Sequence, residues 1–266
     1  MKITRTRDES GCIVLLSEIS TTEGFLIEGD IFGKFEVTDT LVPIRERLAP
    51  LTPPLIVCIA QNYRAHALEL GGSVPERPVF FIKMPHSLLD PDKPIELPRH
   101  LRSDKVDFEA ELAVVIGTTC RNVNAEEALS KVLGYTAAND VSARDWQKEW
   151  GGGQFCRGKG FDTFCPLGPH IVTTDDIPDP GNLHIKGYLN GEMMQDGHTS
   201  DLIFSVPELI AFISGSSTLP AGTVILTGTP SGVGAARSPQ RFLREGDSYR
   251  VEIEGIGPLE NPVREE

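Results

Sequence analysis

Short apolar segments of strand length, separated by turn residues, make up most of this chain. The runs LIVCIA (55–60), VFFIKM (79–84) and TVILT (223–227) are continuously apolar over most of their length and predict buried strands. The segment HIKGYLNGEMMQ (184–195) predicts a hairpin, because Asn-Gly at 190–191 is the strongest short-range hairpin signal. The segment SYRVEIEGIGPLENPV (248–263) predicts a closing pair of strands.

Helical signals are fewer and the helices they predict are short. Asn124 with Glu127 forms a capping box, so we expect a helix that starts there and ends at Gly134. Ser205 with Glu208 forms a second box, which opens VPELIAFIS. Regular strand–helix alternation is absent, so the pattern favours a mixed, strand-rich and mostly antiparallel α/β fold over a doubly wound sheet.

The N-terminal stretch has its own character. Short strands are expected around Ile13–Leu16 and Phe25–Ile27, and a proline-rich joint follows at Pro50–Pro54. We therefore expect a small N-terminal β subdomain over residues 1–52 and a larger domain over residues 53–266.

The segment VDFEAELAVVIG (106–117) carries an unusual pair of charges. As a strand it directs Phe108 to one face and both Glu109 and Glu111 to the other. Neighbouring carboxylates on one face repel unless a cation lies between them, and oxygen-only ligands suit Mg²⁺, Mn²⁺ or Ca²⁺. Asp140, at the end of a short apolar segment, is the best candidate for a third ligand. A solvated strand edge with Asp140 capping a turn is the alternative.

His66 and Glu69 stand at i and i+3 in QNYRAHALEL, so they are neighbours if this segment is helical. A carboxylate beside a histidine fixes its tautomer and raises its basicity, which suits general acid–base work. An ordinary surface helix pair has the same spacing.

Composition and charge narrow the class of protein. The 266 residues carry a formal net charge of -13, which gives no generic attraction to nucleic acid or to anionic lipid. No run of about 18 apolar residues and no apolar signal-peptide core occur, so we expect no membrane partner and a cytoplasmic protein. The five cysteines are scattered without a CxxC, which disfavours a disulfide framework or a zinc site.

One apparent nucleotide motif is rejected. GQFCRGKG (153–160) matches G-x-x-x-x-G-K, but Gly160 stands where a P-loop has Ser or Thr. The preceding residues are polar, and no helix is expected after it, so we do not expect nucleotide binding.

Taken together, several segments resemble the fumarylacetoacetate hydrolase family, especially its domain-containing-protein-2 and acylpyruvase-like branches. The resemblance runs from about residue 56 to 263. The matching segments are QNYRAHALELG, PVFFIKMP, VDFEAELAVVIG, NDVSARDWQ, GKGFDTFCPLGP, NGEMMQ and ILTGTPSGVG. The resemblance implies a β-sandwich roll of the family's C-terminal-domain type.

The same resemblance implies a site. Glu109, Glu111 and Asp140 would hold one divalent ion, Mg²⁺ or Mn²⁺, with Ca²⁺ possible. His66 and Glu69 would form an acid–base dyad on a lid. Lys159, in a glycine-rich loop, and Gln147 would be catalytic. Arg144, Lys83 and Thr229 would bind substrate, with Lys83 lining the cleft.

For function, the resemblance implies a 2-oxo acid substrate and a homodimer. We expect a metal-dependent hydrolase that cleaves a C–C bond of an acylpyruvate or fumarylpyruvate through an enolate stabilised by the metal, with the dyad activating water. Oxaloacetate decarboxylase and 2-hydroxyhepta-2,4-diene-1,7-dioate isomerase are the alternatives within the family. A metal-dependent 2-oxo-acid binding protein without turnover is a less favoured third.

Overall fold

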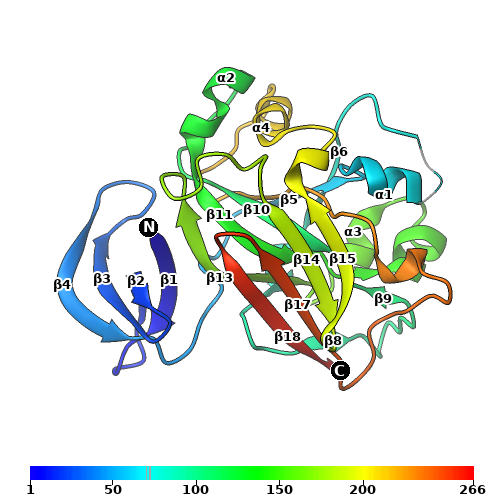
Figure 1. The fold of residues 1–266 in the computed structure, drawn as a ribbon, viewed down its shortest axis with the longest axis horizontal. Coiled ribbons are helices and arrows are strands. Elements are labelled where there is room, and N and C mark those ends of the chain that lie inside the picture. The colour runs from blue at the N-terminus through cyan, green and yellow to red at the C-terminus, as the bar shows by residue number, and fades with distance from the viewer. Residues whose placement is uncertain (70, 72) are drawn as a thin grey trace.

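The computed structural model describes residues 1–69, 71 and 73–266 of the chain. Strands dominate, and they form two packed layers with short helices at the periphery (Figure 1). The expected strand-rich, mixed α/β class is confirmed.

The larger layer is an 11-stranded sheet in the order β4-β3-β2-β1-β13-β11-β10-β16-β5-β6, with β7 beside β13. Its neighbours are mostly antiparallel, and the exceptions are the parallel pairs β16–β5 and β13–β7. The strands are β1 Lys2–Arg7, β2 Ile13–Ser20, β3 Glu23–Gly29, β4 Phe35–Pro43, β5 Ile56–Ala60, β6 Val79–Lys83, β7 Leu88–Leu89, β10 Ala110–Ile116, β11 Val132–Asn139, β13 Cys165–Thr173 and β16 Val224–Leu226.

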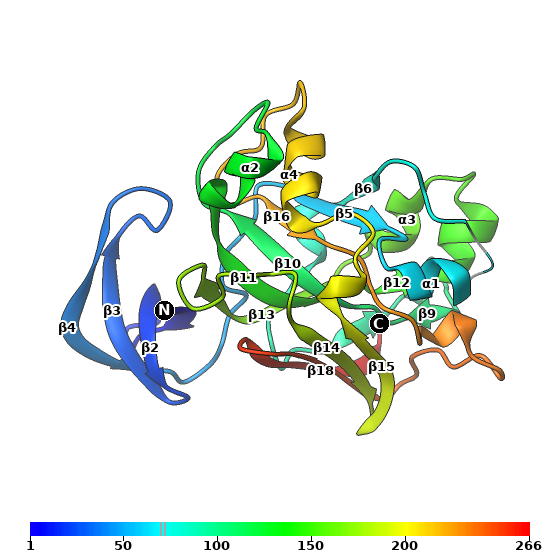
Figure 2. The ribbon, with the colours of Figure 1, turned by 45° about the horizontal axis from the view of Figure 1, so that its top comes forward.

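The smaller layer is a five-stranded sheet in the order β15-β14-β17-β18-β8. It lies in front of the central strands of the large sheet in Figure 1 and below them in the turned view of Figure 2. Between the layers the Phe108 ring stacks on Tyr249, with 4.6 Å between ring centroids. The strands are β8 Ile95–Leu97, β14 His184–Leu189, β15 Glu192–His198, β17 Ser248–Ile253 and β18 Gly257–Glu265; β9 Val106–Asp107 and β12 Ser142–Ala143 form a separate pair.

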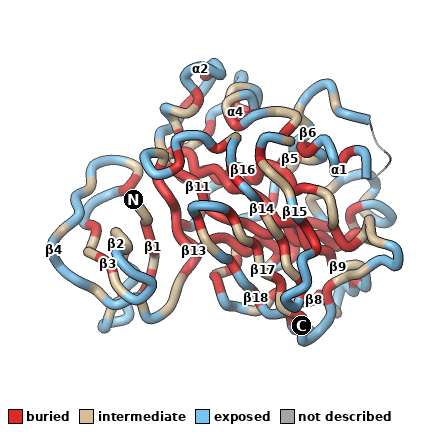
Figure 3. Tube along the Cα trace, in the orientation of Figure 1, coloured by how far each residue is buried: buried red, intermediate tan, exposed pale blue. Residues whose placement is uncertain are grey.

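Burial is greatest where the two layers meet. Figure 3 shows the buried residues gathered along the central strands of the body. All seven residues of β10 are buried, Glu111 among them. This explains why its sequence is apolar apart from one charge that needs partners.

The N-terminal strands β1–β4 stand to one side of the body (Figure 1). They continue the large sheet, because β1 pairs antiparallel with β13 through Lys2–Val172 and Ile3–Ile171. The expected strands around residues 13–16 and 25–27 are confirmed as parts of β2 and β3. The division of the chain at residues 52 and 53 stays a prediction.

The helices are short and lie at the edges of the sheets. None in the described ranges is long and apolar enough to cross a lipid bilayer. Their bounds are α1 Arg64–Glu69, α2 Ala125–Ala128, α3 Phe155–Lys159, α4 Val206–Ser214 and a π-helix at Asp145–Trp150; 3-10 turns occupy Pro85–Ser87, Leu129–Lys131, Thr199–Asp201 and Gly234–Ala236.

Local signals were accurate where side chain and backbone interact directly. The Asn190–Gly191 hairpin and the Ser205 capping box are confirmed. Asn124 caps α2 by accepting the Glu127 N–H at 2.9 Å.

The expected end of the α2 helix at Gly134 is wrong, because α2 ends at Ala128 and Gly134 lies within β11. A Cβ at Gly134 would lie 2.2 Å from the carbonyl oxygen of Val172 on the neighbouring strand. The glycine therefore allows close strand packing, and it caps no helix.

Candidate functional site

The two glutamates of VDFEAELAVVIG lie at a break between strands. The expected continuous strand is interrupted, since β9 ends at Asp107 and β10 begins at Ala110. The side-chain oxygen of Asn139 accepts the Glu109 N–H at 2.9 Å, and that of Gln195 accepts the Ala110 N–H at 2.9 Å. These two amides satisfy backbone donors that would otherwise be buried without partners.

Across this break Glu109 and Glu111 still face the same way, and Asp140 joins them. One carboxylate oxygen of each of the three lies within 4.8 Å of the others, and all three residues are buried. Asp140 directly follows β11, and its N–H donates to the Glu109 carbonyl oxygen at 2.9 Å. The sequence-predicted ligand set is thus brought together in space.

Two lysines neutralise part of this charge. Lys159 Nζ donates to Glu109 and to Asp140, each at 2.7 Å. Lys83 Nζ donates to Asp140 at 2.6 Å and to the Val141 carbonyl oxygen at 3.1 Å.

Two expectations about these lysines need correction. Lys159 ends the helix α3, whereas a glycine-rich loop was expected. Lys83 lies completely buried behind Asp140 and is absent from the described lining of the cleft, which was expected to include it. Its substrate role stays a prediction, and its position favours holding Asp140.

Arg144 connects Glu109 of the carboxylate cluster with Asp107 and Gln147 outside it. Its Nε donates to Asp107 at 2.8 Å, and its Nη1 lies 2.7 Å from Glu109 and 3.0 Å from the Gln147 side-chain oxygen. Asp107 is buried and also accepts the N–H groups of Gly234 and Ala235. Sequence reasoning missed Asp107, although it stands only two residues before Glu109.

The electrostatics single out Glu111. Burial would raise the pKa of Glu109, but Lys159 and Arg144 outweigh it and lower that pKa. Burial, followed by Asp140 and Glu109, raises the pKa of Glu111 well above its usual range. Within the described part of the chain Glu111 pairs with no basic side chain, and it accepts the Gly228 N–H at 2.7 Å. It is the carboxylate that lacks a cation.

A hard divalent cation fits this donor set. Four buried carboxylates (Asp107, Glu109, Glu111 and Asp140) and three cationic side chains (Lys83, Lys159 and Arg144) leave one net negative charge when all are ionised. A divalent ion reverses that sign and gives Glu111 the positive partner it lacks. Carboxylate oxygens are the ligands of Mg²⁺ and Mn²⁺, so the residues present suit either ion.

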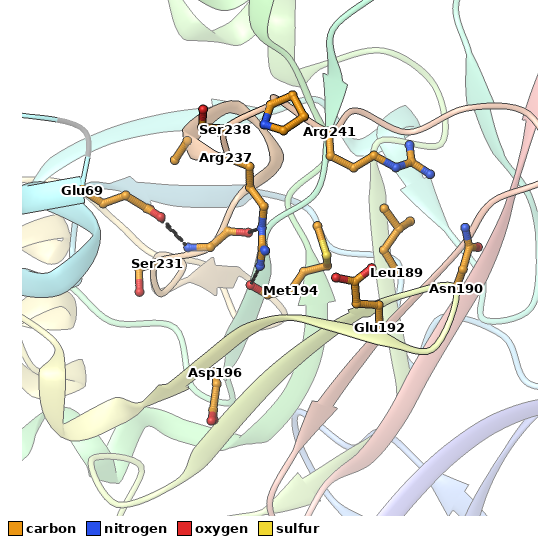
Figure 4. A pocket seen from close by; sticks show the side chains of 13 residues that line it. Glu69, Leu189, Asn190, Glu192, Met194, Asp196, Ser231, Arg237, Ser238 and Arg241 are labelled. Atoms are coloured by element: carbon orange, nitrogen blue, oxygen red, sulfur yellow. Dashed lines mark hydrogen bonds between the residues drawn. The ribbon is translucent and has the colours of Figure 1, made fainter.

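The dyad expected at His66 and Glu69 is present on α1. His66 Nδ1 lies 3.1 Å from the Glu69 carboxylate. Glu69 also accepts the backbone N–H of Gly232, which helps to fix its position (Figure 4). Leu70 and Gly72, in the segment expected to form a lid, lie outside the described residues, and movement of that lid stays a prediction.

A cleft of about 250 Å³ connects the dyad with the carboxylates. His66 lines it together with Glu109 and Glu111, while Gln147, Lys159 and Thr229 complete the polar part of its wall. Phe81, Phe155 and Val233 provide apolar wall. The volume is below the roughly 300–1,000 Å³ of pockets for drug-sized ligands, so the cleft suits a small substrate.

Gln195, from the NGEMMQ segment, connects the smaller sheet to this wall and was also missed. Its Nε2 donates to Thr229 Oγ1 at 2.7 Å, and its Oε1 accepts the Tyr249 hydroxyl at 2.6 Å. Thr229 in turn donates to the Ala110 carbonyl oxygen at 2.9 Å. The Thr229 hydroxyl is therefore held in place at the cleft surface.

A larger, open hollow of about 700 Å³ lies on the other side of the Glu69–Gly232 contact (Figure 4). Glu192, Asp196, Arg237 and Arg241 line it. The guanidinium of Arg241 is paired with Asp247, and that of Arg237 donates to backbone carbonyl oxygens. The hollow therefore borders Glu69 of the dyad, and its described lining includes none of Glu109, Glu111 and Asp140.

Comparison with known proteins gives a consistent result. Residues 55–264 match the family model for the fumarylacetoacetate hydrolase C-terminal domain. The chain is 49% identical over 217 residues to "Oxaloacetate tautomerase fahd2, mitochondrial" of Xenopus laevis, covering 81% of this chain and 67% of that protein. It is 46% identical over 217 residues to human "Oxaloacetate tautomerase FAHD2A, mitochondrial", covering 81% and 68%.

Solved structures of related proteins are similar to this structure over the whole chain. A 2-hydroxyhepta-2,4-diene-1,7-dioate isomerase from Mycobacterium marinum is 37% identical, with a TM-score of 0.87, covering 100% of this chain and 99% of that one. A fumarylacetoacetate hydrolase from Exiguobacterium antarcticum is 36% identical, with a TM-score of 0.88 and 100% of both chains covered. The chain belongs to the fumarylacetoacetate hydrolase family.

Proposed function

We propose that this protein is a divalent-metal-dependent enzyme that interconverts the keto and enol forms of a small 2-oxo dicarboxylate, with oxaloacetate as the first candidate. The observation that carries the proposal is the small cleft lined by His66, which is paired with Glu69, and by Glu109 and Glu111 of the carboxylate cluster. The relatives named as oxaloacetate tautomerases, at 46–49% identity, support the choice of substrate.

Glu109, Glu111 and Asp140 would hold the Mg²⁺ or Mn²⁺ ion, which supplies Lewis-acid polarisation of the 2-oxo group when bound. Lys159 stays hydrogen-bonded to Glu109 and Asp140 and keeps their oxygens oriented. Arg144 fixes Glu109 and the Gln147 amide from the outer side. The cleft therefore offers substrate a preorganised polar wall.

His66 is the group that moves the proton. In the tautomer that donates Nδ1–H to Glu69, Nε2 would carry the free electron pair and act as the base. Nε2 takes a proton from C3 of the keto form, the C3–H electron pair becomes the C2=C3 bond, and the C2=O π pair moves onto the oxygen. That oxygen then takes the proton back from the His66 imidazolium, directly or through a water molecule. The reverse steps return the keto form, with His66 unchanged overall.

Cleavage of a C–C bond is the second candidate, as expected from the sequence. The similarity to a solved fumarylacetoacetate hydrolase favours it, and the same dyad could activate water. Decarboxylation of oxaloacetate needs only the polarised 2-oxo group. A binding protein without turnover is the remaining alternative, and the complete dyad and carboxylate set disfavour it.

One set of assays distinguishes these functions. Purified protein is given enol-rich oxaloacetate with Mg²⁺, and the ultraviolet absorbance of the enol is followed with and without chelator. Release of CO₂ from oxaloacetate and cleavage of acetylpyruvate are measured in parallel. We expect metal-dependent enol-to-keto conversion to be the fastest process. Faster acetylpyruvate cleavage would instead assign a hydrolase, and absence of all three would leave a binding protein.

Assembly and cellular location are further proposals. We propose a homodimer, the commonest assembly for soluble oligomers. We keep the cytoplasmic location as a proposal from the sequence, while the two relatives compared above are named as mitochondrial proteins.

A further inference from the structure

Lys148 lies at the mouth of the cleft and has no assigned role. It follows Gln147 on the π-helix Asp145–Trp150, and both residues line the cleft. Gln147 is buried, whereas Lys148 is exposed at the rim. A π-helix often marks a functional site, because its wide turn re-aims side chains.

The position of this turn is fixed by tight packing against α3. A Cβ added at Gly158 would lie 2.6 Å from the Gln147 backbone nitrogen and 2.8 Å from the Ala143 carbonyl oxygen. Arg144 holds the Gln147 amide at 3.0 Å from the other side. The backbone that carries Lys148 is therefore anchored although its side chain is exposed.

The other two basic side chains that line the cleft, those of Arg144 and Lys159, are already paired with carboxylates. Arg144 pairs with Asp107 and Glu109, and Lys159 pairs with Glu109 and Asp140. Lys148 makes no ion pair or hydrogen bond within the part of the chain that the structure describes, whereas the nearby Lys105 is paired with Glu149. Lys148 is the lining cation still free to bind an anion.

The pKa of Lys148 is shifted by charged groups deeper in the cleft, which indicates that Lys148 lies near them. Burial lowers the pKa of Lys148, and the Arg144 guanidinium lowers it further. Asp107 and Glu109 raise it, so the Lys148 ammonium lies within Coulombic reach of the charged groups at the inner end of the cleft.

We propose that Lys148 recognises the distal carboxylate of a dicarboxylate substrate and so sets the specificity of the cleft for dicarboxylates over monocarboxylates. This inference rests on the proposed function, because the 2-oxo-carboxylate end is taken to lie at the Glu109–Glu111–Asp140 cluster. A substrate with a second carboxylate leaves that charge toward the mouth of the cleft, where Lys148 supplies a charge-assisted hydrogen bond.

The test compares two ligands that share the 2-oxo-carboxylate end. Oxaloacetate carries the distal carboxylate, and pyruvate lacks it. Their affinities for the Mg²⁺-loaded protein are measured by calorimetry, and KM and kcat are measured for oxaloacetate. The variants are Lys148→Gln, Lys148→Arg and, as a control with the same change of net charge, Lys34→Gln, which lies on an exposed turn between β3 and β4.

In Lys148→Gln we expect oxaloacetate binding to weaken by about 10- to 100-fold, the range for loss of a hydrogen bond to a charged group. KM should rise in parallel, kcat and pyruvate affinity should stay near wild type, and Lys148→Arg should restore most of the loss. Lys34→Gln should match wild type.

Equal weakening of both ligands, or an unchanged oxaloacetate affinity, would overturn the assignment. Its failure is distinguishable from failure of the proposed function. Selective weakening in a protein that converts no oxaloacetate would refute only the reaction, whereas wild-type behaviour of Lys148→Gln in an active tautomerase would refute only the role of Lys148.

Discussion

The carboxylate of Glu69 accepts the backbone N–H of Gly232, at 2.9 Å to one oxygen and 3.2 Å to the other (Figure 4). Gly232 has a φ of +104°, and a Cβ there would lie 2.1 Å from the Met194 carbonyl oxygen. The Arg237 Nε donates to the Gly232 carbonyl oxygen at 3.4 Å. The loop after β16 therefore orients the dyad, which would otherwise depend on a helix of only six residues.

Glu69→Gln should remove the charge that fixes the His66 tautomer while keeping the shape of the side chain. We expect kcat for the proton transfer to fall by about 10²-fold or more, since general acid–base catalysis is typically worth about 10²–10⁴. Metal affinity, measured by calorimetry, should stay near wild type because Glu69 is outside the carboxylate cluster. Glu192→Gln is the matched control, since Glu192 lines the outer hollow in Figure 4. Equal losses in the two variants would show that general charge, and not the dyad, causes the effect.

The raised pKa of Glu111 predicts how stability of the metal-free protein depends on pH. The folded state holds the Glu111 proton to a higher pH than the unfolded state, whose value is near 4.5. The contribution of this group is therefore complete below that value and is lost as pH rises through the folded pKa. Metal binding has the opposite pH dependence, because it requires the deprotonated carboxylate. The affinity for Mg²⁺ should therefore rise with pH, and Mg²⁺ binding should release protons.

Calorimetry in buffers of different ionisation enthalpy measures that proton release, and thermal unfolding with and without Mg²⁺ measures the pH dependence. Glu111→Gln should abolish metal binding and flatten the pH dependence of the metal-free Tm. A metal-free Tm of Glu111→Gln that keeps the wild-type pH dependence would mean that another group titrates.

Lys83→Met tests whether Lys83 serves stability or substrate. Removing one partner of a buried ion pair costs about 3–5 kcal/mol, and we expect the lower end because Asp140 keeps Lys159. Urea unfolding measures this loss. For the folded fraction, KM for oxaloacetate should be unchanged, since Lys83 is fully buried behind Asp140. A raised KM with normal stability would favour the substrate role expected from the sequence.

Much of the fold could be predicted because its signals are local. The Asn190–Gly191 turn and the Ser205 capping box each involve residues within four positions, and both are confirmed. The Gly134 expectation failed for the opposite reason. A glycine after a helical pattern reads as a cap, but this one is required by Val172 on a strand far along the chain.

The site residues also divide into those with a local signal in the sequence and those whose role depends on contacts far along the chain. The spacings of Glu109 with Glu111 and of His66 with Glu69 are visible in the sequence, and Asp140 is a candidate there. The family resemblance favours these roles over the alternatives of a solvated strand edge and a surface helix pair. Asp107 looks like any strand-end aspartate until Arg144 and the 234–235 turn are placed around it. The role of Gly232 is invisible for a similar reason, because its contact with Glu69 spans 163 positions.

The protein should form a homodimer in solution. Light scattering at micromolar concentration should give about twice the 29.0 kDa mass of the chain. Dilution into the nanomolar range, followed by the same activity assays, would show whether activity depends on the dimer. A monomeric mass at micromolar concentration contradicts this prediction and leaves the site assignments unaffected.

The comparison of His66→Ala with Glu109→Ala separates proton transfer from metal binding. Glu109→Ala removes a carboxylate from the cluster, so every metal-dependent activity should fall together with metal affinity. His66→Ala leaves the cluster intact but removes the base, so keto–enol conversion and any acylpyruvate cleavage should fall by about 10²–10⁴. Decarboxylation of oxaloacetate needs no base at C3, so it should fall much less, and metal affinity should stay near wild type.

The ratio of the activities within each variant is the diagnostic quantity, because a misfolded or metal-free protein loses all of them in parallel. His66→Gln serves as a second variant that keeps a polar side chain at this buried position. If both His66 variants convert enol to keto oxaloacetate at the wild-type rate, His66 is not the base. The base would then have to be another group that lines the cleft, and Lys159 is unsuited to that role, because its pairing with Asp140 and Glu109 raises its pKa and keeps it an ammonium.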